Sequence, residues 1–395
     1  MVAQTDAHAG RAGTFVLEGP PQERFRVFIP HSLPPDPPLQ LSGEQQILYE
    51  KASQSVGRLD GVGQLLPHVH LFLYYYVRKE ALVSSQIEGT QSSFSDLLLY
   101  ESNITEGIPL TDVREVSNYL AALEYGVSKL SKLPLSGRLF REIHGILLSQ
   151  GRGSAKIPGE FRTSQNWING SRPGNALFVP PPPAKVAPLM ADLEKFLHND
   201  PTATPTLIKA ALAHVQFESI HPFLDGNGRL GRLLITLLLC AEGVLQKPLL
   251  YLSLYFKANR EQYYGLLQAV RTQGAWEAWL TFFLTGVHET AQQAVATAHR
   301  ILKMFDKDRK RIQHDLGRAS GSALRVHHYL QAHPLLSVPS AATELKLTPP
   351  TVYTSVRNLI RLGIVNEITG RSRDQLYVYR QYFNLLKSGT EPIRL

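Results

Sequence analysis

Apolar residues recur at helical spacing along most of the chain, and this periodicity predicts a mainly α-helical protein. The segments with an apolar face of this kind are residues 71–87, 116–130, 139–148, 186–197 and 207–217. A further run, 230–241, is almost wholly apolar and rich in leucine, which is typical of a buried helix. From 289 to 316 the helical pattern continues with increasing charge, so we expect a long helix that leads into a last domain.

Two stretches interrupt the helical pattern. Proline pairs at 20–21, 34–35 and 37–38 exclude a helix from residues 1–40, where we expect a loose arm with a short extended piece near 25–29. Residues 177–179 form a short apolar run between a glycine and four prolines. Such a run favours a small β-hairpin in an otherwise helical region.

Residues 321–385 predict a separate unit. Helical patterns at 323–332, 341–345 and 351–362 are followed by two extended runs around a Gly-Arg-Ser-Arg-Asp turn. This order is typical of a winged helix-turn-helix. The arginines of the third helix and the turn suit the phosphates and major groove of DNA, and they are Arg357, Arg361, Arg371 and Arg373. A winged helix that makes protein contacts or a dimer fits the pattern equally well.

Charge and cysteine content narrow the class of protein. The 395 residues carry a net charge of +8, and the 15 basic and 7 acidic residues of 301–395 account for all of it. An acidic partner is therefore expected only at the C-terminal part. One cysteine excludes an internal disulfide, no leader pattern is present, and the longest apolar run is shorter than the roughly 20 residues of a membrane helix. We expect a folded cytoplasmic protein without a membrane segment.

The densest cluster of reactive side chains is segment 221–232, His-Pro-Phe-Leu-Asp-Gly-Asn-Gly-Arg-Leu-Gly-Arg, between two predicted helices. Gly226 and Gly228 permit a positive φ and leave backbone N–H groups bare at the start of the second helix, where anions bind. Arg229 and Arg232 are three residues apart, so they share a helix face and suit a polyphosphate.

Two further side chains of this segment add chemistry to the anion cradle. Asp225 supplies a hard oxygen that a phosphate-bound Mg²⁺ accepts, and His221 takes up a proton near neutral pH. The segment matches neither the Gly-x-x-x-x-Gly-Lys phosphate loop nor the dinucleotide-binding fingerprint. A base, a metal-type acid and an anion cradle within twelve residues indicate a phosphate site rather than a plain turn.

The segment resembles the signature of Fic-domain proteins, most of which transfer AMP from ATP to a protein hydroxyl group, and no position departs from that signature. The resemblance implies that His221 is the general base on the target hydroxyl and that Asp225 holds Mg²⁺. It further implies that the loop and the two arginines bind the phosphates, from the α-phosphate outward: Gly226, Asn227 and Gly228, then Arg229 and Arg232.

Segments on both sides of the signature fit the same family. Residues 174–183 correspond to a flap that lies beside the active site and holds a target segment by backbone hydrogen bonds, with Phe178 against the nucleotide. Beyond the signature, Asn259 and Tyr263 are candidates for the ribose and adenine wall, and Tyr264 is equally expected in the core. His144 is expected to be a core histidine rather than part of the site.

Glu88 is a candidate regulatory residue. It lies four residues after Ser84 on the same helix face, and Gly89 ends that helix, so the carboxylate meets the negative end of the helix dipole. A partner cation would offset this, although an ordinary solvated glutamate fits the local pattern. Ser-x-x-x-Glu-Gly also resembles the inhibitory motif of Fic proteins, which implies that Glu88 pairs with Arg232, supported by Ser84, and occupies the space of the ATP γ-phosphate.

These features predict a Fic-type helical core with a small β-hairpin flap and a C-terminal winged helix. We expect an N-terminal arm and inhibitory region in 1–110, a catalytic core in 111–290, a linker helix in 291–320 and the winged helix in 321–395. The resemblance implies a protein adenylyltransferase that uses ATP and Mg²⁺ on Tyr, Ser or Thr hydroxyls of target proteins and of itself, restrained by Glu88.

Three alternatives stay open for the function. In the first, the site uses a nucleotide-containing donor other than ATP. In the second, Glu88 aligns a water molecule that removes AMP, so the protein is bifunctional. The third is a DNA-binding regulator whose Fic domain only senses nucleotide, against which the intact His221 argues. The expected partners are a target protein with a hydroxyl side chain, DNA at residues 321–395 and a second copy of the chain.

Overall fold

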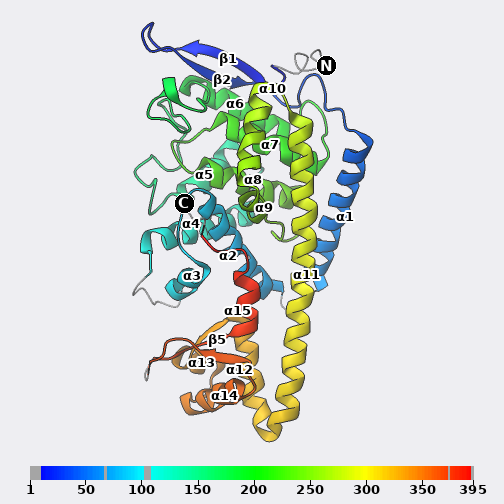
Figure 1. The fold of residues 1–395 in the computed structure, drawn as a ribbon, viewed down its shortest axis with the longest axis vertical. Coiled ribbons are helices and arrows are strands. Elements are labelled where there is room, and N and C mark those ends of the chain that lie inside the picture. Colours follow the sequence, from blue (N-terminus) through cyan, green and yellow to red (C-terminus); the bar gives the residue numbers. More distant parts are fainter. Residues whose placement is uncertain (1–9, 66–68, 102–107, 372–373, 393–395) are drawn as a thin grey trace.

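Helices dominate the computed structural model, which describes residues 10–65, 69–101, 108–371 and 374–392. The molecule is elongated, and α11 (Trp276–Leu316) runs along one side from a large helical core to a smaller C-terminal unit (Figure 1). The prediction of a mainly α-helical protein is confirmed. In the described ranges, no helix has both the length and the apolar character needed to cross a membrane.

The helical core is built around two buried helices. Its helices before α11 are α1 (Gly43–Leu65), α2 (Val69–Ile87), α3 (Phe94–Glu101), α4 (Leu110–Lys129), α5 (Gly137–Leu147), α6 (Pro183–Leu197), α7 (Thr206–Ile220), α8 (Asn227–Ala241), α9 (Ser253–Ala258) and α10 (Arg260–Gln273). Residues 207–220 of α7 and 229–239 of α8 are all buried, because both helices are apolar on nearly every face. The loop between them is therefore held by two fixed ends.

The N-terminal arm contains a hairpin that the sequence did not predict. Strand β2 (Phe25–Pro30) confirms the extended piece expected near 25–29, but it pairs antiparallel with β1 (Gly13–Glu18), so the expectation of a loose arm is wrong over residues 13–18. Val27 and Phe28 of β2 are buried, and the backbone N–H of Phe28 donates to the carbonyl of Val179 at 2.9 Å. The hairpin is thus stabilised by contacts with a distant segment, which local periodicity does not reveal.

Segment 166–173 pairs through Ile168 with the predicted flap, 174–183, and the whole segment 166–183 is called the flap from here on. It is less regular than the predicted hairpin. Its only pairing in the described structure is one bridge between Ile168 and Phe178, in which the N–H of Ile168 donates to the Phe178 carbonyl at 2.8 Å. Four prolines follow Val179 and have no N–H to donate, so the ladder cannot extend.

The C-terminal unit, residues 320–387, packs against the far end of α11. It contains α12 (Ser320–Ala332), β3 (Leu335–Ser337), α13 (Val338–Leu345), α14 (Pro349–Arg361), β4 (Val365–Glu367), β5 (Leu376–Tyr379) and α15 (Arg380–Lys387), with a sheet of order β3-β5-β4. The Tyr379 hydroxyl donates to Asp308 Oδ2 of α11 at 2.7 Å. Arg357 and Arg361 are exposed on α14, and Arg373 lies outside the described residues. A winged-helix role in DNA binding stays a prediction, as do the four domain boundaries.

Candidate active site

A cavity of about 610 Å³ opens beside the loop between α7 and α8. Its walls come from the end of α2, the flap, the last turn of α7, the first turns of α8 and one face of α10. The segments are far apart in sequence, and the buried α7–α8 pair brings them together. The predicted residues Glu88, Phe178, His221, Gly228 and Arg232 all line this cavity.

The loop after α7 is held in a fixed shape by its own side chains. The Asn227 side-chain amide donates to the Phe223 carbonyl at 2.8 Å, and its oxygen accepts the Phe223 backbone N–H at 2.9 Å. Both amide atoms of Asn227 thus hold the loop, and its contact with an α-phosphate stays a prediction. Gly226 precedes α8 with φ 76°, a left-handed conformation that favours glycine.

His144 supports the same loop from below. It donates through Nε2 to the Asp225 carbonyl at 2.9 Å, while Nδ1 accepts the Gly159 backbone N–H at 2.9 Å. Its ring stacks on Phe223 with centroids 3.8 Å apart. Burial lowers the pKa of His144 to about 4, so the ring is neutral at physiological pH. The expectation that His144 is a core residue is confirmed.

His221 ends α7 in a left-handed conformation, with φ 50°. Its carbonyl accepts a hydrogen bond from Arg162 Nε at 2.9 Å, which fixes the backbone. Nδ1 is buried and has no hydrogen-bond partner among the described residues. Burial, and then the nearby charges of Arg271 and Arg162, lower the pKa of His221 to about 3. The imidazole is thus neutral at physiological pH and titrates well below it, which corrects the expectation that the ring takes up a proton near neutral pH.

Arg229 is a buried cation with unused donors. Its side chain is 1% exposed and lies 3.5 Å from Glu115 Oε2 and 3.7 Å from Asp225 Oδ1. Nε and Nη2 make no hydrogen bond within the described structure. Unpaired buried N–H groups are costly, so these donors suit an anionic ligand such as a phosphate. Glu115, which orients Arg229 from α4, gave no signal in the sequence.

Asp225 is the carboxylate that the loop between α7 and α8 itself carries. Oδ1 accepts the Gly226 backbone N–H at 2.6 Å, and Oδ2 faces Gly153, where a Cβ would lie only 2.9 Å away. No group of three or more His, Cys, Asp or Glu in the described ranges is arranged to hold a metal. One carboxylate with a side chain that is 31% exposed fits Mg²⁺, which commonly takes most of its ligands from water and substrate phosphates.

Glu88 lies in the turn that follows α2 and forms an ion pair with Arg232, with Oε1 and Nη2 2.8 Å apart. Arg232 also donates to Ser84, through Nε to Oγ and through Nη2 to the carbonyl, both at 2.9 Å. Ser84 therefore contacts the arginine, whereas the sequence predicted support of Glu88 itself. Burial raises the pKa of Glu88, but the Arg232 guanidinium outweighs burial and holds this pKa below its usual value.

The Glu88 carboxylate also lies against the start of α8. A Cβ at Gly228 would meet Glu88 Oε1 at 2.2 Å, so only glycine leaves room for the carboxylate there. The first turn of a helix presents free N–H groups and positive dipole, which attract anions. Glu88 therefore occupies an anion site formed by Arg232 and the N-terminus of α8.

The far wall of the cavity differs from the predicted ribose and adenine wall. Asn259 does not reach the cavity lining, since its amide donates to the Tyr255 carbonyl at 3.0 Å. Tyr263 lies at the back of the cavity, 1% exposed, with its hydroxyl 2.8 Å from His214 Nε2. Tyr264, which had been equally expected in the core, is 39% exposed and lines the cavity.

Arg271 and Glu218 are cavity residues that the sequence did not reveal. Arg271 donates through Nη2 to the Glu218 carbonyl at 3.0 Å, and its guanidinium carbon lies 3.8 Å from the ring centroid of Phe178. It thereby joins α10, the last turn of α7 and the flap. The face of α10 that lines the cavity comprises residues 260, 264, 267, 268 and 271. Counting the helical period from Tyr264 would therefore have led to Arg271.

Acid is expected to destabilise the fold through its buried histidines. Burial lowers the pKa values of His144, His214 and His221 to about 4, 3 and 3, whereas unfolded histidine titrates near 6.5. The unfolded chain binds more protons in this window, so stability falls as pH drops below about 6.5, by up to about 1.4 kcal/mol per histidine and pH unit. Urea midpoints at about pH 7 and about pH 5 measure this fall.

Glu218 provides the control for this prediction. Burial raises its pKa to about 7, so its contribution to stability is lost as pH rises from about 4.5 to about 7, opposite in sign to the histidines. Glu218→Gln is therefore expected to make the fall on acidification steeper. Equal urea midpoints at the two pH values would contradict the neutral state of the histidines.

The fold and the cavity define a class of protein: a helical domain whose loop places a neutral imidazole beside a buried anion site. Comparisons with known proteins show which family the core resembles. Residues 47–128 match the family described as Fic/DOC family N-terminal, and residues 134–239 match the Fic/DOC family. These two stretches, just under half of the chain, are similar to the Fic/DOC family.

Individual relatives agree with this similarity. The chain is 32% identical over 186 residues to a Drosophila yakuba protein named protein adenylyltransferase Fic, covering 46% of this chain and 34% of that protein. It is 29% identical over 201 residues to a probable protein adenylyltransferase of Aquifex aeolicus, covering 50% of this chain and 59% of that protein. The matched part of the chain thus spans about a third of the length of the Drosophila protein and about three fifths of the length of the Aquifex protein.

The fold has a counterpart among solved structures. A Fic family protein from Desulfovibrio desulfuricans superposes with a TM-score of 0.58 at 22% identity, over 87% of this chain and 97% of that chain. The two proteins share the fold over most of their length.

Proposed function

We propose that this protein is a protein adenylyltransferase, which transfers AMP from ATP to a Tyr, Ser or Thr hydroxyl of a target protein and of itself. The observation that carries the proposal is the neutral His221 beside a buried anion site, where Arg229 has unused donors and Arg232 is held by a carboxylate. The names of the Drosophila and Aquifex relatives support the same activity.

The proposed reaction is an in-line displacement at the α-phosphorus of ATP. The hydroxyl oxygen forms a bond to phosphorus, the bond to the pyrophosphate oxygen breaks, and His221 accepts the hydroxyl proton. Backbone N–H groups of residues 226–228 and the guanidinium of Arg229 stabilise the charge on the phosphates. Asp225 would hold Mg²⁺, which neutralises phosphate charge when bound.

The same geometry supports autoinhibition by Glu88. Because its carboxylate occupies the anion site at Arg232 and the start of α8, an outer phosphate of ATP competes with it for both. Two opposite charges near 4 Å attract by about 4 kcal/mol at an effective dielectric of about 20, and desolvation reduces the net value. A restraint of this size is reversible by binding of a partner or by rearrangement of α2.

The mouth of the cavity supports a protein as the acceptor. Leu177 and Trp167 of the flap are 62% and 38% exposed beside the cavity, an apolar pair that a bound peptide segment would cover. We expect the target segment to lie along the flap and present its hydroxyl to His221. DNA binding by residues 321–395 and a homodimer stay predictions.

Labelled ATP tests the reaction type. The Glu88→Gly variant, incubated with cell lysate and Mg²⁺, is expected to transfer label from the α-phosphate of ATP to protein and none from the γ-phosphate. Transfer of γ-label would show phosphorylation and contradict the proposal, as would absence of any transfer. Competition by unlabelled GTP, CTP and UTP tests the alternative that another nucleotide is the donor.

A further inference from the structure

The chain returns from the C-terminal unit to the core after α15. Residues 388–392, which we call the latch segment, run from the end of α15 along α2 (Figure 1). Thr390 of this segment is 3% exposed, whereas Ser388 and Glu391 are exposed, so the segment is packed against the core at Thr390.

Three side chains of the core bind the backbone of the latch segment. Lys79 of α2 donates to the Ser388 carbonyl at 2.6 Å, and Gln86 of α2 donates to the Thr390 carbonyl at 2.8 Å. Lys257 of α9 donates to the carbonyls of Gly389, at 3.5 Å, and of Glu391. Four consecutive carbonyls are thus satisfied by the core, which is specific docking of backbone rather than incidental contact.

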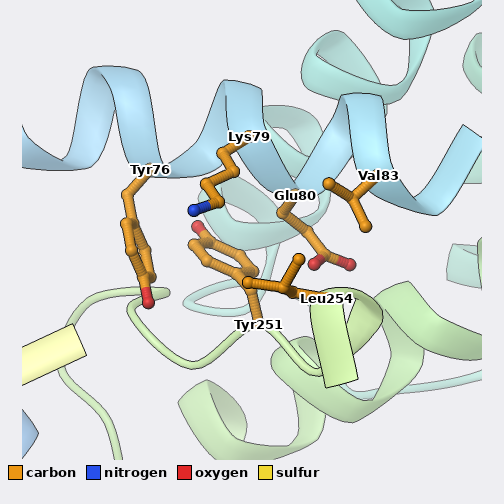
Figure 2. A pocket seen from close by; sticks show the side chains of 6 residues that line it. All are labelled: Tyr76, Lys79, Glu80, Val83, Tyr251 and Leu254. Atoms are coloured by element: carbon orange, nitrogen blue, oxygen red, sulfur yellow. The ribbon is translucent and has the colours of Figure 1, made fainter. Parts of the chain in front are cut away.

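The shape of the latch segment fits the same groove. Gly389 has φ 80°, and a Cβ there would lie 2.9 Å from Leu254 Cδ1, so the backbone passes close to α9. Figure 2 shows Lys79 and Glu80 pointing from α2 to the side where Leu254 and Tyr251 lie. The latch segment therefore bridges α2 and α9 at this place.

The contacts reach the residue that restrains the site. Gln86 precedes Glu88 by two residues at the end of α2. Its amide oxygen accepts from Lys257 Nζ at 2.7 Å, and its amide nitrogen also donates to the Ser92 carbonyl at 3.0 Å. Every polar group of the Gln86 amide is thus engaged, and the end of α2 is fixed in position relative to α9 and the latch segment.

We propose that the latch segment holds the end of α2 so that Glu88 stays on Arg232, with Lys257 as the central positioning residue. The proposal rests on the proposed function and names its regulation. α15 follows β5 directly and packs against both α2 and α11. The ring centroid of its Phe383 lies 6.1 Å from that of Phe94 in α3. A partner that shifts α15 within the C-terminal unit withdraws the latch segment and frees α2.

A double-mutant cycle tests the latch. Lys257→Ala removes the link between α9, Gln86 and the latch segment, without touching the cavity lining. We expect it to raise AMP transfer about fivefold or more in the chain with Glu88, and to leave transfer unchanged in the Glu88→Gly background. Gly389→Trp, which displaces the latch segment from Leu254, is expected to behave in the same way. Lys247→Ala, at an exposed lysine, is the matched control without effect.

The outcomes separate the latch from the enzyme itself. If Glu88→Gly transfers AMP but Lys257→Ala and Gly389→Trp change transfer equally in both backgrounds, or in neither, the latch proposal is overturned. If Glu88→Gly transfers no AMP, the proposed function fails instead. Hydrogen exchange of the backbone amides in 84–90 gives a second measurement, expected to be faster in Lys257→Ala and unchanged in Lys247→Ala.

Discussion

Replacing Glu88 by glycine is expected to raise AMP transfer, including self-modification, by roughly 5- to 150-fold, the range given by a coupling free energy of about 1–3 kcal/mol. The change removes the carboxylate that pairs with Arg232 at 2.8 Å and lies against Gly228, so both anion-binding groups become available to ATP. Glu88 lies in a turn after α2, where glycine is well tolerated. Initial rates with labelled ATP measure the effect.

Two further variants make this prediction specific. Glu88→Gln keeps the size of the side chain without its charge, so a rise smaller than that of Glu88→Gly is expected. Glu142→Ala breaks the exposed ion pair with Arg138, 2.9 Å long, and is expected to leave transfer unchanged. Equal or lower transfer by Glu88→Gly than by the unaltered chain would count against autoinhibition.

His221→Ala is expected to lower AMP transfer by about 10²- to 10⁴-fold, because the hydroxyl then loses its general base. The variant is best measured in the Glu88→Gly background, where the starting rate is high. The His221 side chain has no hydrogen-bond partner at Nδ1 among the described residues, so its removal should disturb the loop little.

Nucleotide binding separates a lost base from a damaged site. The loop is held by Asn227, Phe223 and His144, none of which depends on the His221 side chain. Affinity for a non-hydrolysable ATP analogue is therefore expected to be the same in Glu88→Gly with and without His221→Ala. A double variant that transfers AMP at the rate of Glu88→Gly alone would rule out His221 as the base.

The parts of the structure predicted well are those set by local sequence. The α7–α8 pair follows from its apolar residues, and the sharp loop between them from Gly226, whose φ is 76°. Local sequence also predicted the fold class, the cluster of reactive side chains around the loop and the helix that ends next to Glu88. The proximity of Glu88 to Arg232 came only from the resemblance to Fic-domain proteins, since 144 residues separate them in the chain.

The parts not predicted depend on contacts between distant segments. β1 forms because β2 is anchored at Val179, and Asn227 is committed to Phe223 because the loop closes on itself. Tyr263 and Tyr264 both line the cavity, and only the packing of α10 decides that Tyr263 is buried at 1% exposed while Tyr264 is 39% exposed. The latch segment likewise has no sequence pattern that indicates a binding role, and its contact with Lys257 is seen only in the structure.

The central claim is that Glu88 occupies the anion site that the outer phosphates of ATP require. A crystal structure of the Glu88→Gly variant with Mg²⁺ and a non-hydrolysable ATP analogue tests it most directly, through the distance from the Arg232 guanidinium to the nearest phosphate oxygen. We predict a charge-assisted hydrogen bond of about 2.7–2.9 Å, with the α-phosphate at the first turn of α8 and His221 facing it. An analogue bound in the cavity whose phosphates contact neither Arg232 nor α8 would contradict the account.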